Sequence, residues 1–451
     1  MTTLSCFKAY DIRGKVPEQL NDEIAYRIGR ALVSELKGSC YVVGRDMRLE
    51  SPAIAGALIR GITDAGANVI DIGLCGTEEV YFATSHYAVS GGVMVTASHN
   101  PKGYNGMKLV REGARPISGD TGLSAIRMRV ERDRFDAVSQ RTGDIVERLD
   151  KTAYLQHLLG YVDGARLKPL KILANPGNGA AGPVISALQK ALPFEWVMIN
   201  GVPDGHFPQG VPNPLLPENR ASTREALLAG GCDLALAWDG DFDRCFFFDA
   251  NGRFIEGYYL VALLAQMLLR SNPGSKIVHD PRLTWNTIEA VRGAGGDPVQ
   301  CKTGHAFIKE RMRSEDAIYG GEMSAHHYFR DFFYCDSGMI PWLLICALLC
   351  ETGKTLAELV DAYIAQFPCS GEINYQVSDV AGTIRRLREH YAADALHVDE
   401  TDGVGLEFEA WRFNVRGSNT EPLLRLNIET RADQALLQQK TAEIARLIQE
   451  C

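Results

Sequence analysis

Lys171-Ile-Leu-Ala-Asn-Pro176 is a short apolar strand that ends in a turn, and this pattern occurs three times in the chain. Tyr41-Val-Val-Gly-Arg-Asp46 and Lys276-Ile-Val-His-Asp-Pro281 have the same form. Each of the three is followed by a helical stretch and then by another strand. Strands that alternate with helices are typical of βαβ units, which pair their strands largely in parallel. The sequence therefore predicts three tandem α/β domains.

The C-terminal part of the chain departs from this pattern. From about Cys369 onward it contains a strand near Glu372-Ile-Asn-Tyr-Gln-Val377, a pair of strands around 411–428 and an amphipathic helix from Asp433. This part is predicted to be an α+β domain. We expect an α/β protein with mixed, largely parallel sheets, whose four domains surround a central cleft. The expected domains are residues 1–147, 148–250, 251–367 and 368–451.

Length and composition exclude several classes of function. The 451 residues suggest about three domains, with 46% hydrophobic residues, 23% charged residues and a net charge of −9. A chain with this charge and no basic stripe is not expected to bind nucleic acid or an anionic membrane. No apolar run is long enough to span a bilayer. Eleven cysteines without a Cys-x-x-Cys pair or a signal peptide predict a cytoplasmic protein; no feature assigns an oligomeric state.

A serine lies in the turn Thr96-Ala-Ser-His-Asn-Pro101, after the apolar run Gly91–Val95. Pro fixes its own φ and Asn favours turns, so Ser98 is expected just past a strand end, where α/β proteins place their chemistry. Taken alone, such a serine is more often one that hydrogen-bonds its own backbone. The chain has no Gly-x-Ser-x-Gly elbow, so a hydrolase triad is not supported. Lys108 follows an Asn-Gly turn and could fold back towards this loop.

Three carboxylates lie within five residues in Asp239-Gly-Asp-Phe-Asp-Arg244, between the apolar strands 232–238 and 245–248. Carboxylates this close repel one another unless a cation or protons intervene. Oxygen ligands without a nearby His or Cys indicate a hard ion, Mg²⁺ first and Ca²⁺ second. An EF-hand loop is excluded because Arg244 and Ala250 stand where that loop needs Gly and Glu. The alternative is a solvated acidic turn.

Two more polar stretches complete the pattern. Gly320-Gly-Glu-Met-Ser-Ala-His-His-Tyr-Phe329 places Glu322, Ser324 and His326 at alternating positions, so an extended segment would point them the same way, towards sugar hydroxyls. An ordinary polar loop is the alternative. Arg416-Gly-Ser-Asn-Thr-Glu-Pro422 supplies an arginine fork, hydroxyls and glycine-freed N–H groups, which suit a phosphate. A simple hairpin turn is the alternative there.

These motifs together resemble those of the α-D-phosphohexomutase superfamily, in its phosphomannomutase/phosphoglucomutase branch. The four stretches around Ser98, Asp241, Glu322 and Arg416 match in the expected order, and the likeness runs essentially end to end. Phe7-Lys-Ala-Tyr-Asp-Ile-Arg-Gly14 resembles the family's N-terminus and Lys302-Thr-Gly-His305 its third-domain loop.

The resemblance implies roles for individual residues. Ser98 would be the phosphoserine, and its phosphate would join the three aspartates of 239–243 around one Mg²⁺ per active site. His99, Lys108 and Arg244 match positions near the transferring phosphoryl group, and Lys108, His99 and Arg13 are all candidates for the general base. The metal ligands are then Ser98, Asp239, Asp241 and Asp243. The substrate-binding positions are Tyr10, Arg13, Arg282, His305, Glu322, Ser324, His326, Arg416, Ser418, Asn419 and Thr420.

The chain departs from the family pattern at three positions. Phe242 and Ala325 stand where relatives usually have Gly, and Arg282 stands where relatives often have Lys. A side chain at position 242 can point away from the metal, so ligation should survive. Ala325 and Arg282 bear on the substrate preference.

The implied activity is that of a phosphomannomutase. It interconverts mannose 6-phosphate and mannose 1-phosphate through a phosphoserine and a hexose 1,6-bisphosphate, which is also the activator, and feeds GDP-mannose synthesis. The alternatives are a phosphoglucomutase or dual-specificity phosphohexomutase, with phosphoglucosamine mutase behind them. A leaking phosphoserine enzyme would act as a phosphatase, but a phosphate-binding loop that closes the cleft favours a mutase. A non-catalytic sugar-phosphate sensor would not need both the serine loop and the aspartates.

Overall fold

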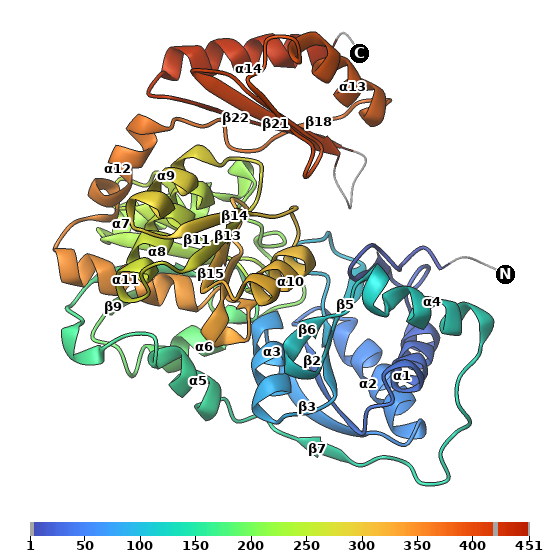
Figure 1. Ribbon diagram of the computed structural model, residues 1–451. Coiled ribbons are helices and arrows are strands. Elements are labelled where there is room, and N and C mark those ends of the chain that lie inside the picture. The colour runs from blue at the N-terminus through green and yellow to red at the C-terminus, as the bar shows by residue number, and fades with distance from the viewer. Residues whose placement is uncertain (1–3, 418–422, 450–451) are drawn as a thin grey trace. The chain divides into compact units, whose positions relative to one another are not determined.

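The structure is a computed structural model that describes residues 4–417 and 423–449 (Figure 1). The chain folds into two compact units. Unit 1 comprises Met1–Phe254 and Asp331–Gly353, and unit 2 comprises Ile255–Arg330 and Lys354–Cys451. The chain therefore passes from one unit to the other at three points, and β12 (Phe254–Ile255) spans the first of them.

The first sheet of unit 1 has the strand order β1-β5-β4-β2-β3-β7, with β6 paired to β5. β2 is parallel to β3 and β4, whereas β5 is antiparallel to β1 and β4. Helices α1 (Asp22–Leu36) and α2 (Ser51–Asp64) cross closely because each has a glycine at the crossing. A Cβ on Gly29 would come within 2.3 Å of the Leu58 carbonyl oxygen, and one on Gly61 within 2.1 Å of the Tyr26 carbonyl oxygen. The strands are β1 (Ile12–Lys15), β2 (Cys40–Arg45), β3 (Asn68–Leu74), β4 (Gly91–Val95), β5 (Tyr104–Arg111), β6 (Arg115–Pro116) and β7 (Ile145–Glu147). The helices are α1 (Asp22–Leu36), α2 (Ser51–Asp64), α3 (Thr77–His86) and α4 (Leu123–Arg132).

The second sheet of unit 1 contains β11-β10-β8-β9 in that order. β8 is parallel to β9 and β10, while β10 and β11 form an antiparallel hairpin that pairs Trp238 with Cys245. The loop 239–244 therefore closes this hairpin. The strands are β8 (Lys171–Asn175), β9 (Glu195–Met198), β10 (Leu234–Trp238) and β11 (Cys245–Asp249). Also in unit 1 are α5 (Thr152–Leu159), α6 (Ala181–Leu188), α7 (Ala221–Gly230), β17 (Cys335–Asp336) and α11 (Ile340–Thr352).

Unit 2 contains one mixed sheet and one antiparallel sheet. In the mixed sheet, β13 is parallel to β14 and β15, and β15 is antiparallel to β16. The antiparallel sheet has the order β18-β22-β21-β20-β19, and α13 and α14 pack on one of its faces (Figure 1). The strands are β13 (Lys276–His279), β14 (Asp297–Gln300), β15 (Tyr319–Gly321), β16 (His327–Phe329), β18 (Ile373–Tyr375), β19 (His397–Asp399), β20 (Val404–Glu407), β21 (Trp411–Gly417) and β22 (Leu424–Thr430). The helices are α8 (Gly257–Ser271), α9 (Trp285–Gly293), α10 (His305–Glu315), α12 (Leu356–Gln366), α13 (Val380–Tyr391) and α14 (Gln434–Gln449).

The predicted fold class is confirmed. The strands predicted at 41, 171 and 276 are β2, β8 and β13, and each has parallel neighbours. Residues from Cys369 onward form the expected α+β arrangement, with the final helix beginning at Gln434. Among the described residues, no helix is both long and apolar enough to cross a membrane.

Candidate active site

Ser98 lies in the loop between β4 and β5, and its backbone is held in an unusual conformation. Its φ is 49°, in the left-handed region, and its side chain is buried. The hydroxyl of Thr96 accepts a hydrogen bond from the Ser98 N–H (2.9 Å) and donates one to Asp46 Oδ2 (2.7 Å). A non-glycine residue in this region costs free energy, so the surrounding contacts must hold it there.

Arg48 supplies those contacts from the segment after β2. Its guanidinium donates to the carbonyl oxygens of Pro101 (3.0 Å), Tyr104 (3.0 Å), Ser98 (2.8 Å) and Asn100 (2.6 Å). Together with the Thr96 contact, both backbone polar groups of Ser98 are therefore fixed. Asp46 and Arg48 were not among the predicted site residues. A paired acid and base directly after a buried strand is the signal that could have indicated them.

The three aspartates of the hairpin loop lie beside this serine. Asp239, Asp241 and Asp243 are all buried, and each offers an oxygen within 4.8 Å of the others. Ser98 Oγ donates to Asp239 Oδ2 at 2.9 Å. Thr77, at the start of α3, donates its hydroxyl to Asp241 Oδ2 (2.6 Å) and its N–H to the Asp241 carbonyl (3.0 Å). The predicted convergence of the serine and the acids is thus present.

Two cations neutralise part of this charge. Lys108 Nζ lies 2.7 Å from Asp241 Oδ2 and 2.5 Å from Asp243 Oδ2, and Arg244 Nη2 lies 2.6 Å from Asp239 Oδ2. Burial alone would raise the pKa of Asp241, but the Lys108 ammonium holds it below its ordinary value. Burial would likewise lower the pKa values of Lys108 and Arg244, and the aspartates instead raise both. We call Ser98, Asp239, Asp241, Asp243, Lys108 and Arg244 the aspartate cluster.

His99 is the neutral member of the neighbourhood. Burial, followed by the charges of Arg244 and Arg13, lowers the pKa of His99 well below its ordinary value. Its Nδ1 lies 2.6 Å from Arg244 Nη2 and 3.1 Å from Ser98 Oγ. Because a guanidinium can only donate, Nδ1 is the accepting nitrogen and the proton is on Nε2.

The donor set fits a hard divalent cation. Asp239 Oδ1 and Asp241 Oδ1 are buried, and neither has a hydrogen-bond partner within residues 4–417 and 423–449. Buried carboxylate oxygens are normally satisfied, so unsatisfied ones indicate a missing cationic partner. Three carboxylates against Lys108 and Arg244 also leave an excess negative charge. Oxygen ligands alone favour Mg²⁺ over softer metals.

Two of the departures from the family pattern lie where the backbone is left-handed, which accounts for the glycine that relatives have there. Phe242 (φ 44°) and Ala325 (φ 69°) both have left-handed backbones. Glycine adopts this conformation freely, and another residue costs roughly 1–2 kcal/mol. The Phe242 ring packs against Gly76, where a Cβ would come within 2.2 Å of it.

In unit 2, Arg282 gathers several predicted substrate residues. Its Nη2 lies 3.0 Å from Asp280 Oδ2, 3.3 Å from Glu322 Oε2 and 3.2 Å from Ser324 Oγ. Its Nη1 lies 3.3 Å from Glu372 Oε2. Burial would lower the pKa of Arg282, but these carboxylates raise it. The charged guanidinium therefore fixes the segment that carries Glu322 and Ser324.

That segment is a turn between β15 and β16, so the prediction of an extended segment was wrong. The Glu322 N–H donates to the His326 carbonyl at 2.9 Å, and Ala325 takes the left-handed conformation within the turn. Because the backbone turns here, Glu322, Ser324 and His326 do not follow the alternation of side chains that an extended strand would give. Glu322 is buried and accepts from Tyr328 Oη at 2.5 Å, whereas Ser324 and His326 are partly exposed.

Arg416, at the end of β21, lies in a second part of the same network. Its Nη2 is 3.4 Å from Glu372 Oε2, and Arg425 Nη1 is 3.2 Å from Glu372 Oε1. Burial, followed by the nearby Arg282, lowers the pKa of Arg416. We call Arg282, Arg416, Arg425 and Glu372 the arginine cluster. The predicted residues Ser418, Asn419 and Thr420 lie outside the described residues.

Three predicted substrate residues lie elsewhere. Arg13 is in β1 and reaches the serine loop, because its Nη1 donates to Asn100 Oδ1 at 2.5 Å; its Nη2 pairs with Asp11 at 2.6 Å. Tyr10 is half-buried just before β1, and His305 is the first residue of α10.

Comparison with known proteins agrees with this arrangement. Phosphoglucomutase/phosphomannomutase domain families match end to end: alpha/beta/alpha domain I over residues 5–137, domain II over 152–252, domain III over 256–367 and the C-terminal domain over 372–447. A Xanthomonas campestris pv. campestris relative described as "Phosphohexose mutases" is 61% identical over 446 residues, covering 99% of each chain.

The chain belongs to the α-D-phosphohexomutase superfamily.

Other matches place it within that superfamily. Escherichia coli (strain K12) phosphomannomutase is 56% identical over 456 residues and covers all of both chains, which indicates the phosphomannomutase branch. The crystal structure of a phosphoglucomutase/phosphomannomutase family protein from Burkholderia thailandensis has a TM-score of 0.89 and 32% identity, and covers 100% of this chain and 98% of that one. As a phosphohexomutase the chain is an isomerase, so the sensor hypothesis is dropped.

Proposed function

We propose that this phosphohexomutase is a phosphomannomutase that interconverts mannose 6-phosphate and mannose 1-phosphate and supplies GDP-mannose synthesis. The observation that carries the proposal is the hydrogen bond from Ser98 Oγ to Asp239 within the aspartate cluster. A hydroxyl held beside three acids and two cations suits phosphoryl transfer, which asks a protein mainly for alignment and charge compensation.

In this proposal Ser98 carries the phosphoryl group. The phosphoryl group passes from Ser98 Oγ to the free hydroxyl of a hexose monophosphate: the P–Oγ bond breaks, a new P–O bond forms to the sugar, and the hydroxyl's proton passes to a general base, for which His99, Lys108 and Arg13 are the candidates. The product is a hexose 1,6-bisphosphate, which also serves as the activator. After the bisphosphate turns end for end, its other phosphoryl group is transferred to Ser98 Oγ: the P–O bond to the sugar breaks, a P–Oγ bond forms, and the sugar oxygen takes up a proton.

The charge balance supports this assignment. Asp239, Asp241 and Asp243 would hold one Mg²⁺, with Ser98 as a further ligand. Bound there, the ion supplies positive charge to the phosphoryl oxygens. A phosphoserine adds a charge of about −2, and the charge of the ion offsets it. Lys108 and Arg244 are then still needed to neutralise the aspartates, as they do in the absence of the phosphate and the ion. Of the candidate bases, His99 is neutral, whereas Lys108 and Arg13 have raised pKa values.

The second half of the substrate is assigned to unit 2. Glu322, Ser324 and His326, with Arg282 and His305, would contact the sugar. Arg416 with Ser418, Asn419 and Thr420 would hold the phosphate that is not being transferred, while Tyr10 and Arg13 would contact the substrate from unit 1. The lowered pKa of Arg416 supports this role, because a bound phosphate would offset the crowding by Arg282.

The mannose preference is supported by the names of the E. coli, Salmonella and Vibrio relatives at 54–57% identity, all phosphomannomutases. The Xanthomonas name, "Phosphohexose mutases", favours a dual-specificity enzyme as the second candidate. Measuring kcat/KM for mannose 1-phosphate, glucose 1-phosphate and glucosamine 1-phosphate separates these. A preference for mannose 1-phosphate of tenfold or more supports the proposal. Equal values would support dual specificity, and a glucosamine 1-phosphate preference would refute both.

The remaining sequence predictions stay part of the proposal. Four domains at 1–147, 148–250, 251–367 and 368–451 are supported by the ranges of the matching families. A cytoplasmic location is supported by cysteines buried as core residues, such as Cys346 and Cys350 in α11. Detection of the protein in a soluble cytoplasmic fraction would test it.

A further inference from the structure

A buried carboxylate outside the predicted site lies next to it in sequence and in space. Glu78 is the second residue of α3 and is fully buried. It accepts four hydrogen bonds, all from neutral donors: Tyr154 Oη (2.5 Å), Ser337 Oγ (2.9 Å), Gly338 N (2.6 Å) and Met339 N (3.2 Å). Burial raises the pKa of Glu78 to about 8. Burying a carboxyl group without a cationic partner costs free energy, so we looked for what Glu78 contributes in return.

The four donors come from two distant segments. Tyr154 belongs to α5, and the other three belong to the turn that precedes α11. Ser337 Oγ also accepts from the N–H groups of Met339 (3.1 Å) and Ile340 (3.0 Å), so the hydroxyl and the Glu78 carboxylate together satisfy the start of that helix. Glu78 therefore fixes the turn 337–339 against the N-terminus of α3.

This turn lies directly against the aspartate loop. The Gly338 carbonyl accepts a hydrogen bond from Trp238 Nε1 at 2.9 Å, next to Asp239. A Cβ on Gly338 would come within 2.3 Å of the Phe242 carbonyl oxygen and 3.1 Å of Arg244 N. Only a glycine fits, so a shift of the turn would push on the loop.

The same helix end also contacts the loop through Thr77, which donates two hydrogen bonds to Asp241. The first turn of α3 thus reaches the aspartates in two ways: Thr77 contacts Asp241 directly, and Glu78 acts through the turn 337–339. Both contacts lie within unit 1.

We propose that Glu78 is a positioning residue for the carboxylates of Asp239, Asp241 and Asp243. It holds the turn 337–339 in the place that shapes the loop 239–244, and so sets the distances between the oxygens that bind the ion. The inference rests on the proposed function, because it takes these carboxylates to bind Mg²⁺.

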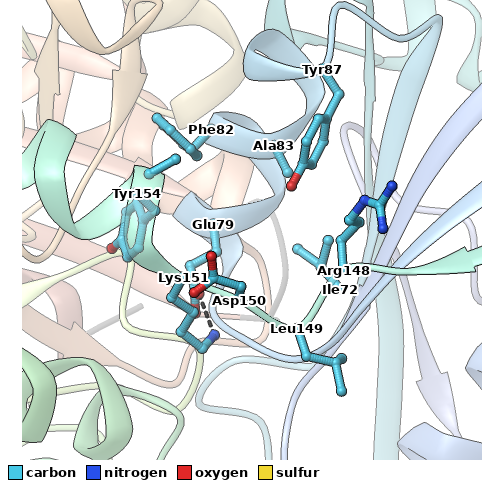
Figure 2. A pocket seen from close by; sticks show the side chains of 11 residues that line it. Ile72, Glu79, Phe82, Ala83, Tyr87, Arg148, Leu149, Asp150, Lys151 and Tyr154 are labelled. Carbon is cyan, nitrogen blue, oxygen red and sulfur yellow. Dashed lines mark hydrogen bonds and ion pairs between the residues drawn. The ribbon is translucent and has the colours of Figure 1, made fainter.

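Glu79 provides a matched control one residue away. It accepts from the Gly76 N–H at 3.0 Å and pairs with Lys151, whose ammonium also donates to the Leu74 carbonyl at 3.1 Å. Figure 2 shows this pair in a small pocket of about 30 Å³ that Tyr154 also lines. The lining includes none of the predicted site residues. Glu79 is therefore buried like Glu78 and adjacent to it, but its hydrogen bonds go to Gly76 and Lys151 and not to the turn 337–339, and the amide oxygen of a glutamine can keep the Gly76 contact.

The test measures Mg²⁺ binding to the full-length protein by isothermal titration calorimetry without substrate, together with kcat and KM. E78A should raise the Mg²⁺ Kd by about 10-fold or more, the range that supporting contacts to metal ligands give, and lower kcat while KM for the hexose phosphate changes less than about threefold. E78Q should recover part of both, because its carbonyl can accept from the two N–H groups and its amide can donate to Tyr154 Oη, whereas Ser337 Oγ already accepts two hydrogen bonds. E79Q should leave the Mg²⁺ Kd within about twofold of wild type.

The inference is overturned if E78A has a lower Tm but an unchanged Mg²⁺ Kd and kcat, since Glu78 would then only stabilise the fold. Should E78A not fold, S337A removes one donor to Glu78 together with the acceptor of the Met339 and Ile340 N–H groups, and it must still raise the Mg²⁺ Kd by about threefold; no change overturns the inference equally. Failure of the proposed function looks different. In that case the wild-type protein itself would show no Mg²⁺ binding or no mutase activity.

Discussion

The aspartate cluster of unit 1 and the arginine cluster of unit 2 are both networks of buried charges, but only the first is unbalanced. In the first, Asp239 and Asp241 each retain a carboxylate oxygen without a donor in the described parts of the chain. In the second, every arginine has a carboxylate partner. Glu372 is shared by Arg282, Arg416 and Arg425, and Asp280, Glu322 and Asp402 also pair with Arg282 or Arg416. The first network is short of positive charge, whereas the charges of the second are paired.

The difference teaches how a protein prepares for a ligand of known charge sign. Desolvated charges are costly unless they are paired, so a buried network with an imbalance is stable only if its ligand completes it or if strong contacts hold it meanwhile. Lys108 does this for the acids, whereas the arginines are already paired with Glu372. The lowered pKa of Glu372, which its three arginines cause against the effect of burial, shows how firmly that carboxylate is held as an anion.

The largest effect is expected for S98A, which removes the only hydroxyl of the aspartate cluster, the group that carries the phosphoryl group in the proposed function. Turnover should fall by at least about 10⁴-fold, the order seen when a nucleophile is removed. Hexose phosphate binding should remain within a fewfold of wild type, because the arginine cluster is intact. A coupled mutase assay and a binding titration measure the two quantities. Activity close to wild type would remove Ser98 from the mechanism.

The second largest effect is expected for D241N, which removes one negative charge from the carboxylates that are proposed to bind Mg²⁺. The Mg²⁺ Kd should rise on the order of 10- to 100-fold, since a hard ion prefers carboxylate oxygens to amide oxygens. The affinity for hexose phosphate in the absence of metal should hardly change. Calorimetric Mg²⁺ titration tests the prediction, and D249N, a buried carboxylate at the far end of β11, serves as the control. An unaltered Mg²⁺ titration would discard Asp241 as a ligand.

R416A changes the second network, in which Arg416 pairs with Glu372 and Asp402. Losing one charged fork should raise KM for the hexose phosphate by about 10-fold or more, the cost of removing a charge-assisted pair, and should let hexose 1,6-bisphosphate escape into solution. The Mg²⁺ Kd should stay within about twofold of wild type. Phosphorus NMR of the reaction mixture follows the escaped bisphosphate. If R416A raises the Mg²⁺ Kd as strongly as D241N does, the two clusters are not the independent sites described here.

The smallest effect is expected in the pH dependence of Tm. It compares Glu78, whose four hydrogen-bond donors are neutral, with Glu372, which pairs with three arginines. The pKa of Glu78 is raised from its ordinary value of 4.5 to about 8, so the folded state binds more protons than the unfolded state between these values. Its stabilising contribution is present below pH 4.5 and is lost as pH rises towards 8. Wild-type Tm should therefore fall by a few degrees more between pH 5 and pH 8 than the Tm of E78Q.

E372Q is the control for that measurement. The pKa of Glu372 is lowered, so this carboxyl is ionised in both states across pH 5 to 8 and its loss should not change the slope of Tm with pH. Parallel slopes for wild type and E78Q would contradict a raised pKa at Glu78.

The sequence predicted the chemistry of the site well, because its main groups come in short motifs. Ser98 and the three aspartates converge as expected, and so do Lys108, Arg244 and His99. The resemblance to the phosphohexomutase family carried this prediction, because the serine loop and the aspartate loop belong to two different sheets and the strand pattern does not bring them together.

The supporting residues could not be predicted in the same way. Arg48 acts on four carbonyl oxygens that any sequence possesses, and Glu78 acts on two backbone N–H groups and two hydroxyls. Such contacts depend on where the backbone runs and leave no pattern of residue types. The turn at Glu322–His326 was mistaken for an extended segment for a related reason: alternating polar residues fit both, and the left-handed Ala325 that decides between them is not the glycine that would signal a turn.

The three crossings of the chain between the units govern how the protein can be divided. A polypeptide that stops at Phe254 would contain Glu78 and Trp238 but not the segment 331–353. It would leave the carboxylate without three of its four donors and the indole N–H without its acceptor. Split-protein or fragment-complementation experiments should therefore retain residues 1–353 in one piece, even though that piece carries a stretch of the other unit with it.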